Sequence, residues 1–289
     1  MGRILPSPEN AAEEAGEERQ KRKAEILRGT KRMKLSERLE RVISFVEPAV
    51  SAADIGTDHG YVPMELVRRG TAEHALAMDV RPGPLSRARD HIAQAGLENQ
   101  IETRLSDGLA KLSAGEADAV IISGMGGELT IRILAEGVHM WKMVRQWVLS
   151  PHSEVFKVRR YLWEHGFSIV REEMVLEDEK YYTILDVRPG NGERIIKGED
   201  ETDGNKAMGP ELKAEAPWGK REYYGEFLPS SMSPAFSQYL KEEERRLLEL
   251  CGTLEVQAER SSRAGKRLKE TKQRLLWNRE VQNEVQGNH

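Results

Sequence analysis

The feature that most restricts the fold of this chain is a regular alternation of short apolar segments with amphipathic ones between residues 35 and 188. Five apolar segments of six or seven residues are separated by stretches whose apolar residues recur with helical spacing. The last two segments, FSIVREEMVLED and YYTILDVRP, follow each other without a helix and predict an antiparallel hairpin. This order predicts an α/β fold: a seven-stranded Rossmann-like sheet with helices on both faces and a terminal antiparallel pair of strands.

Composition divides the chain into four parts. Residues 1–32 are charged and poor in large apolar side chains, which predicts a flexible extension or, alternatively, a wrongly assigned start codon. Residues 33–188 carry the α/β pattern, and residues 189–222 are rich in Gly, Pro, Asp and Lys, which predicts a linker or mobile insertion. Helical spacing returns in residues 223–289, where we expect a coiled-coil hairpin of two antiparallel helices.

Cysteine content and hydropathy exclude several classes of protein. The single cysteine, Cys251, excludes a disulfide framework and a cysteine-only metal cluster, and we expect no metal. No apolar run reaches the roughly 18–20 residues of a membrane span, and the N-terminal segment lacks the apolar core of a signal peptide. We therefore expect a cytoplasmic protein without a membrane partner. The expected state is a monomer, with a dimer as the alternative.

Positive charge is concentrated near the C-terminus. Between residues 257 and 279, eight Lys and Arg accompany two Glu, a net charge of +6 in a chain whose net charge is −4. Such a cluster can neutralise nucleic-acid phosphates, although most charge runs are only the solvated face of a helix. The residues that we expect to contact RNA are Arg263, Lys266, Arg267, Lys269, Lys272 and Arg274.

Polar and glycine residues follow four of the predicted strands, at the sheet edge where open α/β sheets bind ligands. Asp79 ends the second strand, where an acid can accept hydrogen bonds from a ribose diol, and Asp107 after the third can meet an adenine edge. The predicted cofactor-binding residues are Asp54, Gly56, Thr57, Asp58, His59, Asp79, Val80, Asp107, Gly108, Gly124, Met125 and Gly126.

The type of cofactor follows from what the first turn lacks. There is no G-x-G-x-x-G after the first strand and no G-x-x-x-x-G-K-[ST] in the chain, which disfavours an NAD-dependent oxidoreductase and a nucleotide triphosphatase. Asp54 and Asp58 would repel phosphate and suit a cationic cofactor with an amino-acid tail, such as S-adenosylmethionine. Either Asp taken singly is as well explained by a helix N-cap or a solvated loop. The agreement of four strand ends favours a cofactor site.

The motifs DIGTDHGYVP, SDGL and ISGMGGELTIRIL, preceded by MKLSERL, resemble the bacterial tRNA (adenine-22-N1) methyltransferases, the TrmK family. The resemblance covers residues 33 to 188 and the GEFLPSSMSPAFSQYL stretch. It implies a class I methyltransferase domain that binds S-adenosylmethionine, a C-terminal coiled coil, and methylation of N1 of an adenosine in tRNA. The chain has Ser150-Pro151-His152 where the family often has Gln-Pro-Asn, and Asp79 where it often has Glu.

Five residues are predicted to act at the acceptor base: Asp58, His59, Tyr61, Pro151 and His152. N1 of adenine carries no proton, so its attack on a methyl group needs no general base, and the enzyme contributes mainly positioning. Asp58, with His59 as its hydrogen-bond partner, is the candidate for stabilising the cationic product. Tyr61 is placed to stack on the base, while Pro151 and His152 shape its pocket. The alternative for His59 is a purely structural role.

Two other functions fit the same residues. A class I methyltransferase that acts on another RNA, a protein or a small molecule would share every cofactor residue, and would differ in its acceptor pocket and basic segment. A non-catalytic RNA-binding scaffold with a retained cofactor fold is the second alternative. The intact acids Asp54, Asp79 and Asp107 and the GMGG turn count against the scaffold.

Overall fold

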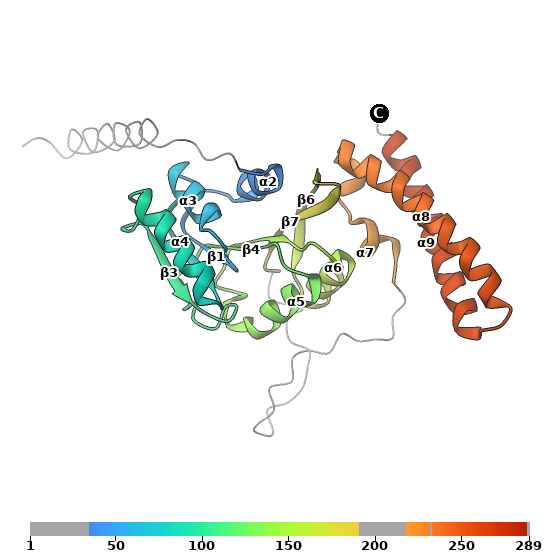
Figure 1. The fold of residues 1–289 in the computed structure, drawn as a ribbon, viewed down its shortest axis with the longest axis horizontal. Coiled ribbons are helices and arrows are strands. Elements are labelled where there is room, and N and C mark those ends of the chain that lie inside the picture. The colour runs from blue at the N-terminus through green and yellow to red at the C-terminus, as the bar shows by residue number, and fades with distance from the viewer. Residues whose placement is uncertain (1–34, 191–217, 232, 288–289) are drawn as a thin grey trace, which may run out of the picture.

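The structure, a computed structural model, describes residues 35–190, 218–231 and 233–287 (Figure 1). Its centre is one seven-stranded sheet with the order β3-β2-β1-β4-β5-β7-β6. Strands β1 to β5 are parallel, and β7 is antiparallel to both β5 and β6. The strands are β1 (Ala49–Ile55), β2 (Ala72–Asp79), β3 (Ile101–Leu105), β4 (Ala119–Ser123), β5 (Gln146–Ser150), β6 (Ser168–Glu177) and β7 (Lys180–Arg188). The predicted sheet and terminal antiparallel pair are confirmed.

Five helices accompany this sheet. Their N-terminal signals are local. Ser36 is the N-cap of the first helix and accepts a hydrogen bond from the backbone N–H of Leu39 at 3.3 Å. Pro82 is the first residue of its helix, where the backbone N–H would have no partner within the helix. The helices are α2 (Glu37–Phe45), α3 (Tyr61–Arg68), α4 (Pro82–Gln94), α5 (Gly127–Glu136) and α6 (Val155–Glu164), with the short 3-10 turn η1 (Val138–Met140) after α5.

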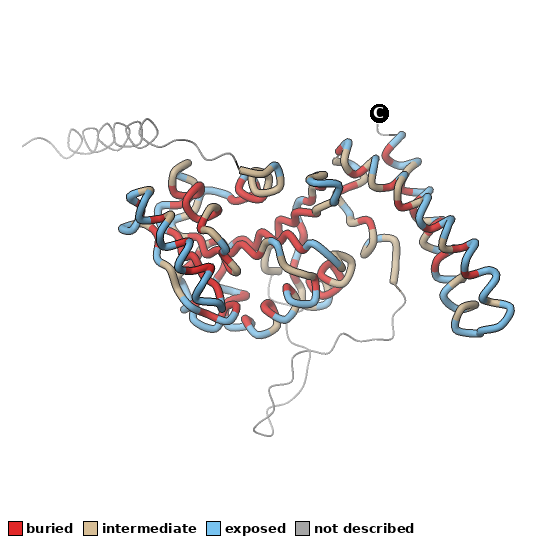
Figure 2. Tube along the Cα trace, viewed as in Figure 1, coloured by how far each residue is buried: buried red, intermediate tan, exposed pale blue. Residues whose placement is uncertain are grey.

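The two faces of the sheet bury different helices, because successive side chains of a strand point to opposite sides. On β4, Val120 and Ile122 pack with α5 and α6, whereas Ile121 between them packs with α2 and α3. Helix α4 covers the same face as α3, over β2. Figure 2 shows buried residues running through the central strands, so the main core is the sheet with its two helical layers. This arrangement leaves the carboxyl ends of the parallel strands free to form a site.

The C-terminal part is a hairpin of two long helices that projects from the sheet domain (Figure 1). Helix α8 (Pro234–Ala258) starts at the N-cap Ser233 and runs antiparallel to α9 (Ser262–Gly287). Apolar side chains at helical spacing, including Leu247, Cys251, Leu254 and Leu275, are buried between them. Two short elements precede the hairpin, α7 (Lys220–Tyr224) and the 3-10 turn η2 (Leu228–Ser230). The predicted pair of helices is confirmed.

Two of the predicted segments lie largely outside the residues that the structure describes. The extension at residues 1–32 and residues 189–222 of the expected linker lie outside the described residues, apart from 189–190 and 218–222. Residues 218–222 include the start of α7, which packs against α6 of the sheet domain. None of the described helices combines the length and the apolar character that crossing a membrane requires.

Candidate cofactor and acceptor site

A cavity of about 330 Å³ opens at the carboxyl ends of β1, β2, β3 and β4. Parallel strands end at one edge of the sheet, so residues far apart in sequence meet there. Among the residues predicted from the sequence, those that line the cavity are Gly56, Asp79, Val80, Asp107, Gly108, Gly124, Met125, Gly126 and His152. The structure therefore brings together one residue or more from each of the four predicted strand ends.

The turn after β1 passes close over its neighbours because of Gly56. This residue has φ +82°, and a Cβ added to it would lie 2.0 Å from Cε of Met125. The backbone N–H groups of Gly56 and Thr57 both donate to the carbonyl of Met78, at 2.7 and 2.9 Å. These bonds fix the turn at the end of β2 and keep backbone, rather than side chain, at the cavity wall.

Asp79 is buried at the wall of the cavity, where β2 leads into α4. Its Oδ1 accepts a hydrogen bond from the backbone N–H of Arg81 at 2.7 Å, and the Arg81 guanidinium lies 3.6 Å away. These contacts orient the carboxylate without covering it. A carboxylate fixed at this point suits the binding of hydroxyl groups.

Asp54 lies behind the cavity, in the interior of β1, and does not belong to the wall that the described residues form. Burial is the largest influence on its carboxyl group and raises the pKa of Asp54 to about 6. The Thr57 side chain and Arg38 act in the opposite direction, whereas Asp79 adds to the rise. Asp54 can thus influence the cavity through its charge and through the β1 turn, rather than by direct contact.

Seven residues of the wall were not among the predicted site residues: Ile55, Ser106, Ser123, Arg81, Leu129, Arg132 and Ile133. The last three have i, i+3, i+4 spacing and therefore share one face of α5. Because α5 starts directly after the glycine turn of β4, its first turns face the cavity. The position of the glycine turn in the sequence could therefore have predicted these three residues. Arg132 also lies 3.7 Å from Asp107, so a cation accompanies this exposed acid.

Asp58, His59 and Tyr61 lie outside the cavity wall formed by the described residues, unlike the sequence-based expectation. Asp58 is 55% exposed, forms an ion pair with Arg87 of α4 and lies 3.2 Å from Nε2 of His59. The hydrogen bond from Arg87 holds the pKa of Asp58 below its usual value. The Asp58 charge, which was expected to face a cationic cofactor, is therefore neutralised on the surface by Arg87 of α4. The sequence pattern did not indicate this partner.

The rings of His59, Tyr61 and His91 form a cluster of nearly parallel rings beside this ion pair. The three ring centroids lie 5.2 to 5.6 Å from one another, and the interplanar angles are 12° to 23°. The His91 ring nitrogen Nδ1 also contacts the His59 carbonyl at 3.0 Å. These contacts agree with the structural role that was the alternative for His59, and they place Tyr61 on the α3–α4 side.

On the opposite side, the loop after β5 borders the cavity. Pro151 is buried and His152 is exposed, and the His152 backbone N–H donates to the Met125 carbonyl at 2.9 Å. The loop also touches the start of α5, because a Cβ on Gly127 would lie 2.7 Å from the Ser153 carbonyl oxygen. His152 is thus the predicted acceptor residue that the structure places at the cavity.

Arg38 of α2 reaches the same region and was not predicted. Its guanidinium donates to Oγ of Ser123, a wall residue, at 2.9 Å and lies 5.1 Å from the centroid of the Tyr182 ring. Its backbone N–H donates to Glu177 at 3.1 Å. These contacts connect α2 with the carboxyl end of β4.

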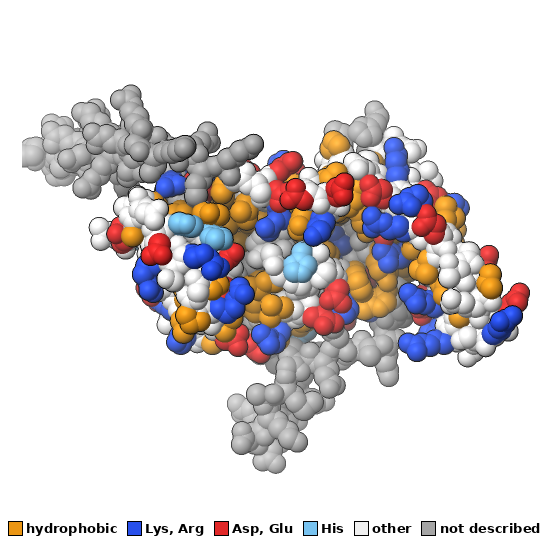
Figure 3. Space-filling view, in the orientation of Figure 1, with side chains coloured by type: hydrophobic (Ala, Val, Ile, Leu, Met, Phe, Trp, Pro, Cys, Tyr) orange, Lys and Arg blue, Asp and Glu red, His pale blue; other side chains and the backbone are white. Residues whose placement is uncertain are grey.

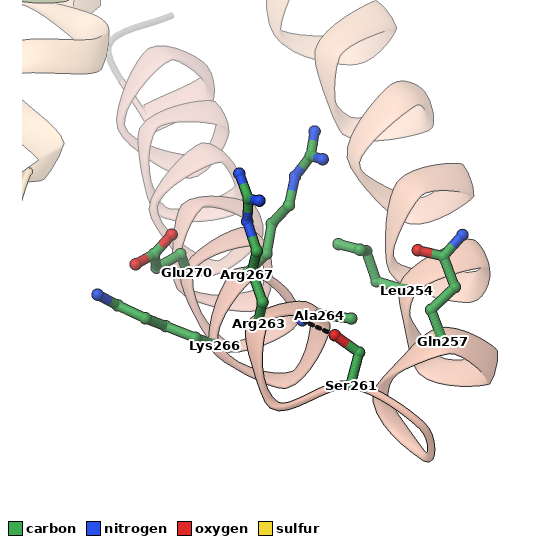
Figure 4. A pocket seen from close by; sticks show the side chains of 8 residues that line it. All are labelled: Leu254, Gln257, Ser261, Arg263, Ala264, Lys266, Arg267 and Glu270. Carbon is green, nitrogen blue, oxygen red and sulfur yellow. Dashed lines mark hydrogen bonds between the residues drawn. The ribbon is translucent and has the colours of Figure 1, made fainter.

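Five of the six predicted RNA-binding residues divide into two groups, and the sixth, Lys269, is exposed on α9. At the tip of the hairpin a second cavity, of about 600 Å³, is lined by Arg263, Lys266 and Arg267 together with Leu254 and Gln257 of α8. Figure 4 shows the two arginines rising into the space beside Leu254, while Lys266 points away from it. In the space-filling view, basic side chains recur along the hairpin with acidic ones among them (Figure 3).

Arg274 and Lys272 belong to the other group, because both have carboxylate partners. Arg274 forms an ion pair with the buried Glu243 and lies 4.4 Å from the centroid of the Tyr223 ring. Lys272 is 2.7 Å from Glu255 across the hairpin. The prediction that Arg274 is a surface contact for RNA is not supported, since its guanidinium holds α8 and α9 together.

The sheet order and the glycine-lined cavity at its carboxyl edge define a class of protein, the Rossmann-like methyltransferases. Residues 35–185 match the family described as "Methyltransferase domain". Over 166 residues the chain is 32% identical to the tRNA (adenine(22)-N(1))-methyltransferase of Bacillus subtilis, covering 57% of this chain and 70% of that protein. The chain belongs to this family of methyltransferases, as its motifs indicated.

Solved structures agree with this assignment over the greater part of the chain. The crystal structure of Bacillus subtilis TrmK, an m1A22 tRNA methyltransferase, superposes with a TM-score of 0.71 at 27% identity and covers 87% of this chain and 100% of that one. A candidate tRNA (m1A22) methyltransferase from Streptococcus pneumoniae, solved in complex with S-adenosyl-L-methionine, has a TM-score of 0.68 at 30% identity. It covers 86% of this chain and 100% of that one.

Proposed function

We propose that this chain transfers a methyl group from S-adenosylmethionine to N1 of adenine 22 in tRNA. The observation that carries the proposal is the cavity at the carboxyl ends of β1 to β4, in a chain of this family, with Gly56, Asp79 and Asp107 at its wall. The activity and the cofactor named for the relatives are consistent with it.

The residues of the cavity fit this cofactor. Asp79 is oriented to accept hydrogen bonds from a ribose, and the turns at Gly56 and Gly124, both with positive φ, allow backbone to approach a ligand closely. Asp107 and Gly108 follow β3, where an adenine edge would lie. When bound, S-adenosylmethionine supplies an electrophilic methyl group carried by its sulfonium sulfur, which is left as a neutral thioether after transfer. The acids of this edge, including the buried Asp54, favour such a cation over a phosphate.

The acceptor base would enter beside the loop after β5. His152 lies at the cavity, and Arg38 and Ser123 mark the neighbouring wall. N1 of adenine is on the Watson–Crick edge, so the base has to be unpaired or turned out of its stack before it can approach. The reaction needs no proton removed from N1, and what these residues contribute is orientation and exclusion of water. Asp58, paired with Arg87 on the surface, is not part of this proposal.

The tip of the hairpin is the surface that we assign to the tRNA backbone. Arg263, Lys266, Arg267 and Lys269 are exposed there. Contacts of this kind neutralise phosphates and orient the substrate without reading its sequence. Sequence selection is then left to the base pocket and to the shape of the tRNA.

Transfer of labelled methyl groups to unmodified tRNA transcripts tests the proposal. We expect labelling of a transcript with adenosine at position 22 and its loss when that nucleotide is guanosine. Undiminished labelling of the guanosine transcript would exclude the assigned target. Labelling of a protein or a small molecule in place of tRNA would favour a methyltransferase of another substrate class.

A matched pair of charge reversals tests the RNA surface. Lys266→Glu/Lys269→Glu changes two exposed residues of the hairpin tip, and Lys111→Glu/Lys142→Glu makes the same change on the sheet domain. We expect the first variant to weaken tRNA binding about tenfold at low salt and to reduce its salt dependence. The affinity for S-adenosylmethionine should stay the same in both. Equal weakening by the two variants would show that only net charge matters.

A further inference from the structure

A buried ion pair lies where the hairpin segment meets the sheet domain. Arg159 of α6 and Glu172 of β6 are both almost fully buried, with Nε of Arg159 2.7 Å from Oε1 of Glu172. The Arg159 guanidinium also donates to the carbonyls of Glu222 and Tyr223, at 2.8 and 3.0 Å. Oε2 of Glu172 accepts from the backbone N–H of Glu226 at 3.1 Å. The pair therefore holds the backbone of the segment that leads into α8.

An outer layer of arginine and aromatic side chains covers this pair. The Arg160 guanidinium lies 3.6 Å from the centroid of the Trp218 ring and 2.9 Å from a carboxylate oxygen of Glu222. Arg221 lies 3.8 Å from the centroid of the Trp163 ring. The buried pair and the contacts of Arg160 form the α6 clamp, which we define as Arg159, Arg160, Glu172, Trp218 and Glu222.

The segment held by the clamp is also fixed to the hairpin. Tyr224 is fully buried and packs with Leu240 of α8 and Val281 of α9. The ring of Tyr223 contacts both Arg274 and Trp277 of α9. One short stretch thus touches α6 on one side and both long helices on the other, so the clamp determines how the hairpin is oriented.

The N-terminal end of α6 belongs to the acceptor region. His152 borders the cavity two residues before Glu154, which precedes α6 and has φ +53°. Lys157, in the first turn, is within 2.6 Å of both Glu128 of α5 and Glu154. A single ten-residue helix therefore carries the acceptor loop at its start and the clamp over its remaining length.

We propose that the α6 clamp consists of positioning residues, which fix the hairpin so that a tRNA held at its tip presents the target base to the cavity. The inference rests on the proposed function. Removing one partner of a buried ion pair leaves an unpaired buried charge and destabilises a protein, whereas replacing both partners with apolar residues avoids that penalty. What such a replacement removes is the set of directed bonds to the backbone of residues 222–227, and with them the orientation of the hairpin.

Three variants test this role. Arg159→Met/Glu172→Met replaces the buried pair, and Trp218→Ala independently removes the partly buried ring of the outer layer. The control Arg104→Met/Glu116→Met removes an ion pair of 2.7 Å on the β3 side of the sheet domain, between residues that belong neither to the cavity wall nor to the clamp. We expect both clamp variants to lower kcat/KM for tRNA about 10- to 100-fold, mainly through KM. The dissociation constant for S-adenosylmethionine should change less than twofold, and the control should behave like the parent.

Distances between spin labels test the orientation without any activity. In a Cys251→Ala background, Val138→Cys and Leu248→Cys place labels at exposed sites on the sheet domain and on α8. We expect a narrow distance distribution for the parent and control and a broad one for the clamp variants. A parent-like distribution in folded clamp variants, or a broad one with unchanged kcat/KM for tRNA, would overturn the inference. Trp218→Ala carries the test if the double variant does not fold.

These measurements separate the two proposals. A parent chain that methylates no tRNA, but whose clamp variants show broadened distances, would refute the proposed function and leave the fixation of the hairpin established. A parent that methylates tRNA, with clamp variants of unchanged kcat/KM, would refute the positioning role alone.

Discussion

Replacing Asp54 by Asn should make the stability of the protein less dependent on pH. Asp54 is buried in β1, and its pKa in the folded chain is about 6, against 3.8 for an ordinary Asp. A raised pKa means that ionisation opposes folding. The folded state favours the protonated Asp54 carboxyl. The contribution of this protonated form to the free energy of unfolding is fully present below pH 3.8 and is lost as the pH rises through about 6. Each tenfold change in an ionisation constant corresponds to about 1.4 kcal/mol, so the loss amounts to about 3 kcal/mol.

The measurement is the free energy of unfolding of the parent and of Asp54→Asn, by urea denaturation between pH 4 and 8. The side-chain amide is neutral throughout, so any constant effect of the substitution cancels when the difference is followed across pH. We expect the variant to gain about 2.5 kcal/mol relative to the parent from pH 4 to pH 8, because part of the full change already occurs below pH 4. A difference that stays constant over this range, or that moves in favour of the parent, would refute the account of Asp54.

Asp58→Asn is the contrasting variant. The hydrogen bond from Arg87 lowers the pKa of Asp58, so its carboxylate contributes stability above pH 3.8 that is lost as the pH falls through the lowered pKa. The free energy of unfolding of the parent should therefore increase relative to that of Asp58→Asn as the pH rises, which is the direction opposite to that for Asp54. The effect should be small, because Asp58 is 55% exposed and water screens the pair.

Two further substitutions test the site and the hairpin. Gly56→Ala should destabilise the chain by about 1–3 kcal/mol, because φ is +82° and the new methyl group would meet Met125. Calorimetry should show weakened S-adenosylmethionine binding. Unchanged binding would show that the turn has room for the methyl group. Arg274→Met should cost about 2–3 kcal/mol, less than the 3–5 of a fully buried pair because the Arg is one-third exposed, whereas exposed Lys269→Met should stay within 0.5 kcal/mol. Equal thermal stability of Arg274→Met and Lys269→Met would show that Arg274 does not hold the two helices together, and Arg274 would again be a candidate for contact with RNA.

The sequence was sufficient where the signals are local. The alternation of apolar segments predicts the sheet, its terminal antiparallel pair and the two long helices. The N-cap at Ser36 follows from the residue type and the helical spacing after it. Since ends of parallel strands meet at one edge, the residues after β1 to β4 were predicted to come together without knowledge of any contact, and Gly56, Asp79 and Asp107 do line one cavity.

The sequence was insufficient where a side chain has a partner distant along the chain. Asp58 turns to Arg87, 29 residues away, and Arg274 to Glu243, 31 residues away. Nothing in the composition around either residue distinguishes these pairs from solvated charges. The partnership of Arg159 with Glu172 likewise depends on how α6 lies on β6. Leu129, Arg132 and Ile133 could have been predicted, since they share the face of α5 that follows the glycine turn.

The contacts of α6 have a consequence for exchanging parts between relatives. A hairpin transferred as α8 and α9 alone would leave behind Arg159 and Glu172, which bind the backbone just before it, and also Tyr223, whose ring contacts α9. The transferred α9 would then meet the recipient's own residue in place of Tyr223. A unit that keeps these bonds within one parent runs from the loop after β5 through α6, β6 and β7 to the end of α9. Chimeras between family members that are cut after Ser150 should therefore retain the orientation of the hairpin better than those cut at Pro234.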